Sequence, residues 1–568
     1  MTNKQIAQQF KSLAQLMELH EENSYKIRSY SSAYRIFRAA TEPVYEMNLT
    51  QVKQLKGIGD AIGNKVQELR LNGEMKIMKG YLEKTPKGIV ELLKIKGLGI
   101  GKIKTLWLQM GIQSPGELLY ACNENRLITV KGFGTKTQSN IKQQLEYYFL
   151  SIDKFHYARL EEEAENIILD IQEVLDTELI SLTGDIRRLM PVLTSIEILL
   201  GSNDVKKLEE EDILTIEEEK NGIWKCKTIE NDFPVIIYSC NPDYWGYQLL
   251  RTTGNETFLK DFFEVFYPEK IDWKKNPTPE SLKGISEEEL FEKADLPFIP
   301  AEIRDVHKIL YKIKARSVPQ LLEETDIKGV LHAHTTWSDG ATSLEELATY
   351  VKSLGYEYLG LTDHSQAAFY ANGLKADRVL EQFKEVDKLN EKLAPFKILK
   401  GIESDILHNG SLDYPEEILK QFDFIIASVH AHLRMDKHTA TQRLITAIKN
   451  PYTTILGHPT GRLLLSRQGY PIDHEAVIDA CAKHNVIIEL NANPHRLDLD
   501  YTWIPYALEK GVKITINPDA HSLAGVHDIH FGVLAARKGM LTAAECPNTL
   551  SLEDFEALLA KKKEAVSA

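Results

Sequence analysis

The C-terminal region of the chain alternates short apolar segments with amphipathic stretches long enough for a helix, such as residues 343–354 and 377–393. This alternation predicts parallel β–α–β units. Parallel strands are covered on both faces, which explains why they read as continuous apolar runs. The apolar segments are residues 327–332, 358–364, 398–403, 424–430, 454–458, 486–493 and 514–521. Most of them end on a His, Asp, Glu or Asn. We therefore expect seven parallel strands whose carboxyl ends share one functional edge.

The first apolar segment ends in the pair His332 and His334. Residues i and i+2 of an extended strand point to the same face, so both imidazoles can bind one metal ion. A single His-x-His pair is weak support, because such pairs also occur as surface or core features. The repetition of ligand-type residues at the later strand ends favours a metal site at the rim of a barrel related to the TIM barrel.

Six motifs of this region, met in order, resemble those of the PHP (polymerase and histidinol phosphatase) domain family. They are His-x-His with a downstream Asp, Thr-Asp-His-Ser (362–365), Gly-Ile-Glu-x-Asp-Ile (401–406), Ser-Val-His (428–430), Gly-His-Pro-Thr-Gly-Arg (457–462) and Asp-Ala-His (519–521). The resemblance implies a distorted seven-stranded (β/α) barrel over residues 325–568 with a trinuclear metal site. The implied ligands are His332, His334, Asp339, His364, Glu403, His430, His458, Asp519 and His521.

The same resemblance divides the ligands into three groups, one for each divalent ion of the barrel. The groups are His332, His334, Glu403 and Asp519; Glu403 again, as a bridge, with His430 and His458; and Asp339, His364 and His521. Mixed imidazole and carboxylate ligands favour Mn²⁺, Zn²⁺ or Fe²⁺ over Mg²⁺, which prefers oxygen ligands. Such ions polarise a phosphoryl oxygen and lower the pKa of bound water, so the expected reaction is hydrolysis of a phosphate ester.

The residues expected to carry this hydrolysis are His332, His334, Glu403, Asp519 and Arg462. Arg462 follows the fifth strand and Arg496 follows the sixth, so either one can clamp phosphate oxygens or, equally well, cap a barrel loop. Lys375 is a weaker candidate for a phosphate contact. His432 and His495 match no ligand position and are expected at the surface or outside the ligand shell.

The first 150 or so residues are helical in pattern and repeat one short motif three times. An apolar residue, a Lys, Gly-x-Gly and the start of a helix occur at 55–63, 95–103 and 130–137. The glycines allow a tight turn, and the amides at the following helix N-terminus point toward an anion. The motif resembles the helix-hairpin-helix element, which binds a DNA phosphate without reading bases. The expected DNA-binding residues are Gly57, Gly59, Lys65, Gly97, Gly99, Gly132 and Gly134.

Residues 17–33 and the turn at Gly57 resemble the N-terminal lyase domain of family-X DNA polymerases. The resemblance places Lys65 where a lysine of that family forms a Schiff base with an abasic sugar, and Ala61 where some members carry a second lysine. A lysine near the start of a surface helix is more often a solvated charge or a phosphate contact, and this alternative stays open. We expect a lyase-like domain at 1–80 and a fingers-like domain with two hairpins at 81–150.

Residues 151–320 are expected to form the palm and thumb of such a polymerase, an α+β domain of the nucleotidyltransferase type. In the family, a Gly-Ser-x-Arg-Arg turn precedes two metal-binding aspartates, and a third aspartate lies on a later strand. Here the turn lies at 183–188, and counting from the family pattern places Ser195, Glu197 and Ile236 at the three acidic positions. Two-metal nucleotidyl transfer requires carboxylates on both ions. We therefore predict a degenerate palm that retains its fold without polymerase activity.

Length, charge and cysteine usage are consistent with a multidomain intracellular chain. The 568 residues suggest three to five domains, and a Pro-containing charged linker is expected at 274–280. The net charge of −14 argues mildly against wrapping of nucleic acid, but it permits local phosphate binding. The five scattered cysteines read as free thiols. We see no signal peptide and no membrane-spanning run, and we expect a cytoplasmic, monomeric protein without a membrane partner.

The order of hairpins, degenerate palm and barrel is similar to that of bacterial family-X polymerase–PHP proteins over nearly the whole chain. The resemblance implies a Mn²⁺-dependent 3′→5′ exonuclease with abasic-site and 3′-end processing by the PHP domain, acting on single-stranded or gapped DNA. Alternatives are a histidinol-phosphatase-like small-molecule phosphatase, a family-X polymerase with residual gap-filling activity and a DNA-binding scaffold with a structural barrel.

Overall fold

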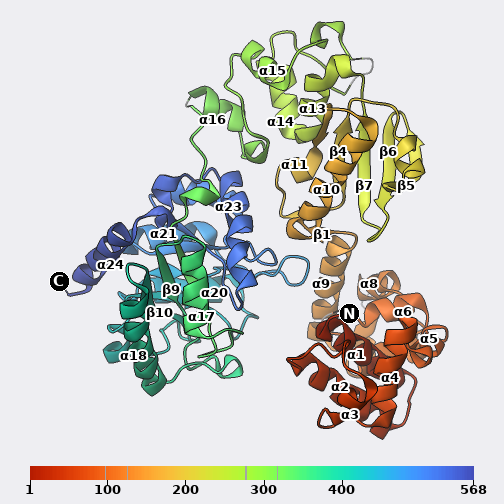
Figure 1. Cartoon of the computed structure of the whole chain (residues 1–568), viewed down its shortest axis with the longest axis vertical. Coiled ribbons are helices and arrows are strands. Elements are labelled where there is room, and N and C mark those ends of the chain that lie inside the picture. The colour runs from red at the N-terminus through yellow and green to blue at the C-terminus, as the bar shows by residue number, and fades with distance from the viewer. Residues whose placement is uncertain (96, 124–125, 275–277, 316, 568) are drawn as a thin grey trace. The chain divides into compact units, whose positions relative to one another are not determined.

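The computed structural model describes residues 1–95, 97–123, 126–274, 278–315 and 317–567. The chain divides into two compact units, residues 1–152 and 153–568 (Figure 1). Lys96 of the second hairpin motif and residues 275–277 of the expected linker lie outside the described residues. The domain boundaries expected at residues 80, 150 and 320 stay predictions. None of the helices in the described part of the chain combines the length and the apolar character needed to cross a bilayer.

The first unit is helical, as predicted. Its helices are α1 (Asn3–Leu19), α2 (Ser24–Ala39), α3 (Leu49–Gln54), α4 (Asp60–Asn72), α5 (Lys76–Leu82), α6 (Lys87–Leu92), α7 (Ile100–Met110), α8 (Pro115–Asn123) and α9 (Thr135–Ser151). They bury two separate apolar clusters, one from residues 6–75 and one mainly from residues 89–145. Helix α1 shows how the sequence specifies these elements, because Thr2 and Gln5 form a reciprocal capping box at its N-terminus.

The second unit begins with a five-stranded sheet in the order β2-β4-β7-β6-β5. Its strands are β2 (Ile180–Leu182), β4 (Ile196–Leu200), β5 (Leu214–Lys220), β6 (Ile223–Thr228) and β7 (Pro234–Ser239). Helix α10 (Tyr157–Leu175) buries Leu160, Ala164, Ile167 and Ile171 against this sheet, and their i, i+4, i+7 spacing defines one apolar face. Strands β4 and β7 are parallel, with Glu197 opposite Ile236.

A helical region follows the five-stranded sheet in the chain. Its main helices are α13 (Trp245–Thr253), α14 (Glu256–Lys260), α15 (Glu287–Lys293) and α16 (Ile309–Ala315), and α11 (Gly184–Arg187) contacts α13. These helices bury an aromatic cluster that includes Phe258, Phe262 and Phe291. Arg304 is buried over this cluster and pairs with Glu287, which also binds Arg187.

The rest of the second unit is a barrel of seven parallel strands in the order β14-β13-β12-β11-β10-β9-β8. The strands are β8 (Gly329–Ala333), β9 (Tyr358–Leu361), β10 (Lys397–Asp405), β11 (Phe424–Ser428), β12 (Ile455–Leu456), β13 (Ile487–Asn491) and β14 (Ile514–Asn517). A parallel bridge between Ala333 and Ala520 joins the two ends of the sheet and nearly closes it. The predicted parallel barrel is confirmed.

Helices cover the outside of the barrel (Figure 1). They are α17 (Leu344–Ser353), α18 (Ala376–Leu393), α19 (Glu416–Leu419), α20 (Lys437–Ile448), α21 (His474–His484), α22 (Ile504–Glu509), α23 (Ile529–Lys538) and α24 (Leu552–Ser567). Helix α17 begins with a capping box between Ser343 and Glu346, and it buries Leu344, Leu347 and Val351 on one face. The predicted helices at 343–354 and 377–393 correspond to α17 and α18.

Glycines in two adjacent strands make room for a large side chain inside the barrel. A Cβ atom at Gly360 would lie 2.6 Å from the ring of Phe424, and one at Gly401 would lie 2.5 Å from it. Real side chains do not approach that closely, so both positions require glycine if Phe424 is to fill the interior. At the same end, the rings of Tyr358 and Phe555 stack at 5.1 Å, which attaches α24 to the barrel.

Lys538, near the end of α23, links the barrel to the region that precedes it. Its side chain is fully buried, and Nζ donates to the Asp305 carboxylate at 2.7 Å, to Arg188 O at 2.7 Å and to Glu302 O at 3.2 Å. A buried ammonium is stable only with such a complete set of acceptors. The barrel and the preceding region therefore share one buried polar network.

We expect Lys538→Met to lower the free energy of unfolding by roughly 3 kcal/mol, because it leaves Asp305 without one of its two buried cationic partners. Urea unfolding of the full chain measures this loss. The exposed Lys449→Met is the control and should change the free energy by less than about 0.5 kcal/mol. Equal unfolding curves for the two variants would show that the buried network does not stabilise the unit.

Candidate metal centre

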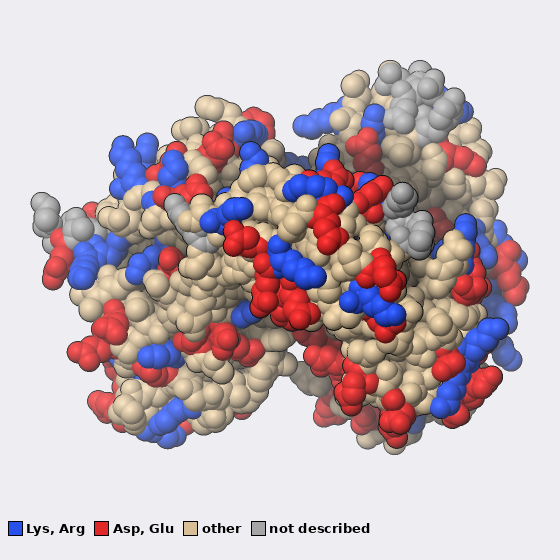
Figure 2. All heavy atoms as spheres, turned by 90° about the horizontal axis from the view of Figure 1, so that it is seen from above, with Lys and Arg blue, Asp and Glu red and all other residues tan. Residues whose placement is uncertain are grey.

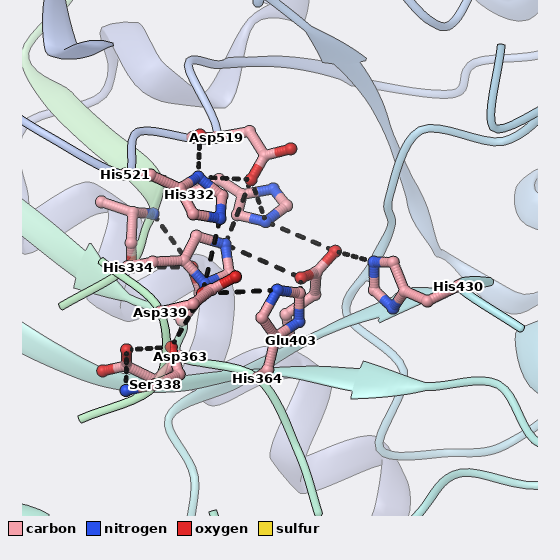
Figure 3. Close-up of polar contacts among 12 residues, drawn as sticks. His332, His334, Ser338, Asp339, Asp363, His364, Glu403, His430, Asp519 and His521 are labelled. Carbon is pink, nitrogen blue, oxygen red and sulfur yellow. Dashed lines mark hydrogen bonds and ion pairs between the residues drawn. The ribbon is translucent and has the colours of Figure 1, made fainter. Parts of the chain in front are cut away.

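The strand ends bring the ligand-type side chains of the barrel to one rim (Figure 3). His332 lies in β8 and Glu403 in β10, and most of the others lie in the loops that directly follow a strand. His332, His334, Glu403 and His458 are at most 1% exposed. Eight of the nine expected ligands are labelled in Figure 3, where their side chains face a common space.

Three groups of ligand atoms have all their members within 4.8 Å of one another. They are His332, His334 and Asp519; His364, Glu403 and His430; and His334, Asp339, His364 and His521. Glu403 also approaches His458 Nε2 at 3.0 Å and His332 Nε2 at 3.5 Å. The carboxylate of Glu403 is therefore central to the whole cluster. The role of each residue as a metal ligand stays a prediction.

His364 differs from the expected grouping because it faces two groups. Its Nδ1 lies 3.0 Å from Glu403 Oε2, and its Nε2 lies 3.6 Å from Asp339 Oδ1. The expected set places His364 only with Asp339 and His521. Sequence spacing identifies which strand end a histidine follows, but it does not determine which neighbour each ring nitrogen faces.

The donor set fits divalent cations on the basis of its unsatisfied polar atoms. His332 Nε2, His334 Nδ1, His364 Nδ1 and Glu403 Oε2 are buried and lack a hydrogen-bond partner. Buried polar atoms are normally satisfied, since an unpaired one costs free energy. A cation bound among these atoms satisfies them together, and imidazole with carboxylate suits Mn²⁺, Zn²⁺ or Fe²⁺.

The ionisable groups of the cluster are coupled, and not all of them rest in the form that coordinates a cation: burial opposes protonation of His430, but Glu403 and Asp405 outweigh it and raise its pKa to about 10. Burial opposes ionisation of Glu403, but the imidazoles of His430, His332 and His364 prevail and hold its pKa well below the usual range. Burial and the neighbouring His364 lower the pKa of His334 to about 3. An ionised carboxylate and a neutral imidazole are the forms that coordinate cations.

A buried carboxylate that the motifs do not include orients His332. Glu489 Oε2 lies 2.7 Å from His332 Nδ1, and Asn491 and Asn517 donate to the Glu489 carboxylate at 3.0 Å each. The contact makes Nδ1 the donor and leaves Nε2 free to face the cluster. Sequence analysis missed Glu489 as a site residue. Its signal was the spacing of Glu489 and Asn491, which places both on one face of β13.

Two further carboxylates hold the ligand loops. Asp405 Oδ1 lies 3.2 Å from His430 Nδ1, opposite the ring nitrogen that faces Glu403. Asp363 accepts from Thr335 N at 2.8 Å and from Ser338 N at 3.2 Å, which fixes the loop leading to Asp339 (Figure 3). Asp363 and Asp405 both belong to the motifs named in the sequence analysis. The expected ligands in those two motifs were His364 and Glu403 instead.

The three hairpin motifs of the first unit share one backbone conformation. Their first glycines, Gly57, Gly97 and Gly132, have φ of 93°, 85° and 94°, in the left-handed region that favours glycine. Their second glycines, Gly59, Gly99 and Gly134, are the N-caps of α4, α7 and α9, and none of these caps has a side-chain hydrogen bond. The first-turn amides are thus not capped by their N-cap side chains. That arrangement suits a phosphate.

Comparison with known proteins supports both parts of this description. Residues 1–75 match the helix-hairpin-helix domain family, and residues 331–493 match the PHP domain family. The DNA polymerase/3′-5′ exonuclease PolX of Bacillus subtilis (strain 168) is 33% identical over 584 residues, which cover 98% of this chain and 99% of that protein. The chain belongs to the bacterial family-X DNA polymerase–PHP proteins.

Other relatives match less than half of the chain. A probable phosphatase of Acetivibrio thermocellus is 29% identical over 250 residues, covering 41% of this chain and 96% of that protein. A probable phosphatase of Thermoanaerobacter sp. (strain X514) is 34% identical over 201 residues, covering 34% of this chain and 77% of that protein. The predictions of family, fold class and enzyme are confirmed, and the PHP domain is a metal-dependent hydrolase.

Arg462 and Arg496, near the candidate metal centre, have different surroundings. Arg462 donates from Nε to Arg496 O at 2.9 Å, and its other nitrogens bind Leu497 O and the Asp500 carboxylate. The geometry therefore favours the loop cap for Arg462 over the phosphate clamp. Arg496 Nε lies 3.7 Å from Asp519 Oδ2, so its guanidinium faces the cluster. 

The remaining candidates lie outside the three ligand groups. Lys375 is exposed at the N-cap of α18. The ring of His432 contacts His408 at 5.5 Å, and the ring of His495 contacts His156 at 4.4 Å. These placements agree with the expected surface or outer positions of the two histidines.

The three counted palm positions lie in or next to the neighbouring strands β4 and β7. Glu197 faces Ile236 across β4 and β7, and Ser195 precedes β4 with its Oγ buried and unpaired. Burial raises the pKa of Glu197, which accepts from Tyr238 Oη at 2.9 Å and from Asp185 N at 3.2 Å. Of the three counted positions, one carries a carboxylate.

In the first unit, the Lys65 ammonium is bound by the Glu68 carboxylate, which also accepts from Lys76 N at 2.8 Å. The lyase role of Lys65 stays a prediction.

We expect Glu489→Gln to weaken metal binding about 10- to 100-fold, because the variant removes the charge that orients and polarises His332. Calorimetric titration of the metal-free chain with Mn²⁺ measures the change. The exposed Glu475→Gln is the matched control on the neighbouring helix. Unchanged Mn²⁺ affinity in Glu489→Gln would remove Glu489 from the site.

Proposed function

We propose that the chain is a metal-dependent 3′→5′ exonuclease that trims DNA 3′ ends and abasic sites in its PHP barrel. The proposal rests on one observation above all: ligand-type side chains from all parts of the barrel face one space at its rim. The three hairpins explain why a barrel of this kind is joined to a DNA-binding region.

The proposed centre takes three divalent ions, of which Mn²⁺ is the first choice and Zn²⁺ or Fe²⁺ the alternatives. His332, His334 and Asp519 would hold one with Glu403; Glu403, His430 and His458 a second; Asp339, His364 and His521 a third. When bound, such ions polarise the phosphoryl oxygen and lower the pKa of water at the site. Glu489 keeps His332 in the tautomer that faces the cluster.

Arg496 is the proposed phosphate-positioning residue. Its guanidinium faces Asp519 at the edge of the cluster, where it can donate bidentately to two oxygens of the substrate phosphodiester. Asp519 remains ionised beside it: burial opposes this, but His332, His334 and Arg496 hold its pKa well below the usual range. Arg496 thus helps to keep the Asp519 carboxylate ionised and also positions the substrate phosphate.

DNA is the proposed substrate because phosphates are what the hairpin amides recognise. On the face drawn in Figure 2, Lys and Arg are interspersed with Asp and Glu rather than gathered in one basic stripe. Local contacts at the hairpins suit this charge distribution better than wrapping of DNA does. We infer single-stranded or gapped ends as substrates, a cytoplasmic location and a monomer.

We expect His332→Ala and Glu403→Ala to lower hydrolysis of a 5′-labelled single-stranded oligonucleotide by more than roughly 100-fold, since each removes a ligand rather than a ligand's support. DNA affinity should stay within about twofold, because the hairpins lie in the other unit. The exposed His438→Ala serves as control. Nuclease activity at the wild-type level in both variants would refute the site assignment.

The palm is proposed to be inactive as a polymerase. Glu197 supplies one carboxylate where the reaction needs three, and that carboxylate is occupied by Tyr238 and a backbone amide. We expect no dNTP incorporation above background in primer extension with Mg²⁺ or Mn²⁺. Robust incorporation that is lost in Glu197→Gln would overturn this claim and support gap filling.

A small-molecule phosphatase is the second candidate, favoured by the probable phosphatases that match less than half of the chain. The two functions differ in how substrates compete. If DNA is the substrate, single-stranded oligonucleotides inhibit hydrolysis of p-nitrophenyl phosphate at concentrations near their own KM. A phosphatase would hydrolyse the small ester efficiently and ignore the oligonucleotide.

A further inference from the structure

An exposed aromatic pair stands in the loop between β9 and α18. Phe369 is 86% exposed and Tyr370 is 61% exposed, and their rings meet edge to face at 5.9 Å. Phe369 has the largest exposed fraction among the large apolar side chains that the structure describes. Scattered exposed apolar residues are normal, but two adjacent aromatic rings at a site mouth call for a partner.

The loop presents the pair rather than leaving it unsupported. Ala368 and Ala371, on either side of the two rings, are 0% and 2% exposed. The short turn Phe369–Ala371 therefore buries its small side chains and directs the aromatic ones outward. Burying an aromatic ring normally stabilises a fold. The rings of Phe369 and Tyr370 do not contribute in this way, since each keeps most of its surface in water.

Hydrogen bonds fix the loop at both ends. A parallel bridge joins Ser365 to Leu374, and Ala367 N donates to the Asp413 carboxylate at 2.6 Å. Asn372 Nδ2 donates to Trp337 O at 3.1 Å, which ties the loop to the segment that carries Asp339. A rigid support lowers the entropy cost of binding through an exposed side chain.

The pair lies beside the metal centre. The ring of Tyr370 is 6.4 Å from the ring of His364, and His364 faces both Glu403 and Asp339. A phosphodiester bound at the cluster therefore has its neighbouring nucleosides within reach of Tyr370 and, next to it, Phe369. Every nucleobase has a flat face that stacks on such rings.

We propose that Phe369 and Tyr370 form a nucleobase-binding platform at the barrel mouth, on which a base adjacent to the scissile phosphodiester stacks. The inference rests on the proposed nuclease function and gives its site a preference for nucleic-acid substrates. Stacking is independent of base identity, so the platform holds any 3′-terminal sequence. It also makes abasic ends poorer in binding than base-containing ends at this subsite.

The test compares Phe369→Ala, Tyr370→Ala and the double variant with Phe369→Trp and Tyr370→Phe, which keep an aromatic ring. Exonuclease KM for a single-stranded oligonucleotide should rise roughly 5- to 150-fold in the alanine variants, with kcat changed less than about twofold. The aromatic replacements should retain the wild-type KM. Hydrolysis of glycerol 2-phosphate, followed by release of inorganic phosphate, should be equal in all variants, because this ester carries no aromatic ring that could stack.

Oligonucleotides with one abasic site at each of the last three positions locate the stacked base. At that position, and only there, the wild type should lose its KM advantage over the double variant. A second readout needs no turnover: 2-aminopurine at the same position should be quenched by the wild type in Ca²⁺ and remain bright with the double variant.

The outcomes separate this inference from the proposed function. Equal KM for wild type and double variant on every oligonucleotide, with normal nuclease activity, overturns the platform alone. A wild type that cleaves the small ester and no oligonucleotide overturns the nuclease itself. A KM rise that the aromatic replacements fail to rescue also overturns stacking, because it would report loop damage.

Discussion

Burial of the Glu403 carboxylate is the constraint on which the barrel site depends. A carboxylate removed from water is stable as an anion only when cations or strong donors replace its hydration. Glu403 has nitrogen atoms of His364, His430 and His458 within 3.1 Å, and each comes from a different strand end. The charge is therefore compensated only if the strands meet in register. Closure of the barrel therefore also determines whether the site at its rim can form.

The grouping of the expected ligand residues at one rim was predictable because the position of each is encoded locally. An apolar strand followed at once by His or Asp places that side chain at the rim whatever the rest of the barrel does. Glu489 was not predictable in this way, because it becomes a partner of His332 only when β13 and β8 enclose the same interior. The role of Arg462 likewise depends on the path of the loop at 496–500, which no local pattern specifies.

In the palm region the prediction rests on counting residues from a turn, and it stays a prediction. Spacing alone set Glu197 against Ile236, and the parallel register of β4 and β7 places them opposite each other. Regular strands have a fixed rise per residue, so positions counted from a turn transfer well. What the count does not reveal is the second task of this region, where the buried Arg304–Glu287–Arg187 pairs hold the sheet to the helices that follow. That task needs no catalytic acid, so it is compatible with the proposed loss of polymerase activity.

The two DNA-facing parts of the proposed enzyme read different features of the substrate. The hairpins offer backbone amides, which bind any phosphate along a strand and so cannot distinguish an end from an interior position. Selection of an end must then occur at the barrel, where most of the ligand cluster is buried and the ring of Tyr370 lies 6.4 Å from that of His364. A terminal nucleotide can place its phosphodiester at the cluster while the DNA strand leaves the barrel mouth on one side only. An internal nucleotide requires the strand to leave on both sides. Glu403 is 1% exposed, and we propose that this burial, which admits a strand end more easily than a continuous strand, favours exonuclease over endonuclease action.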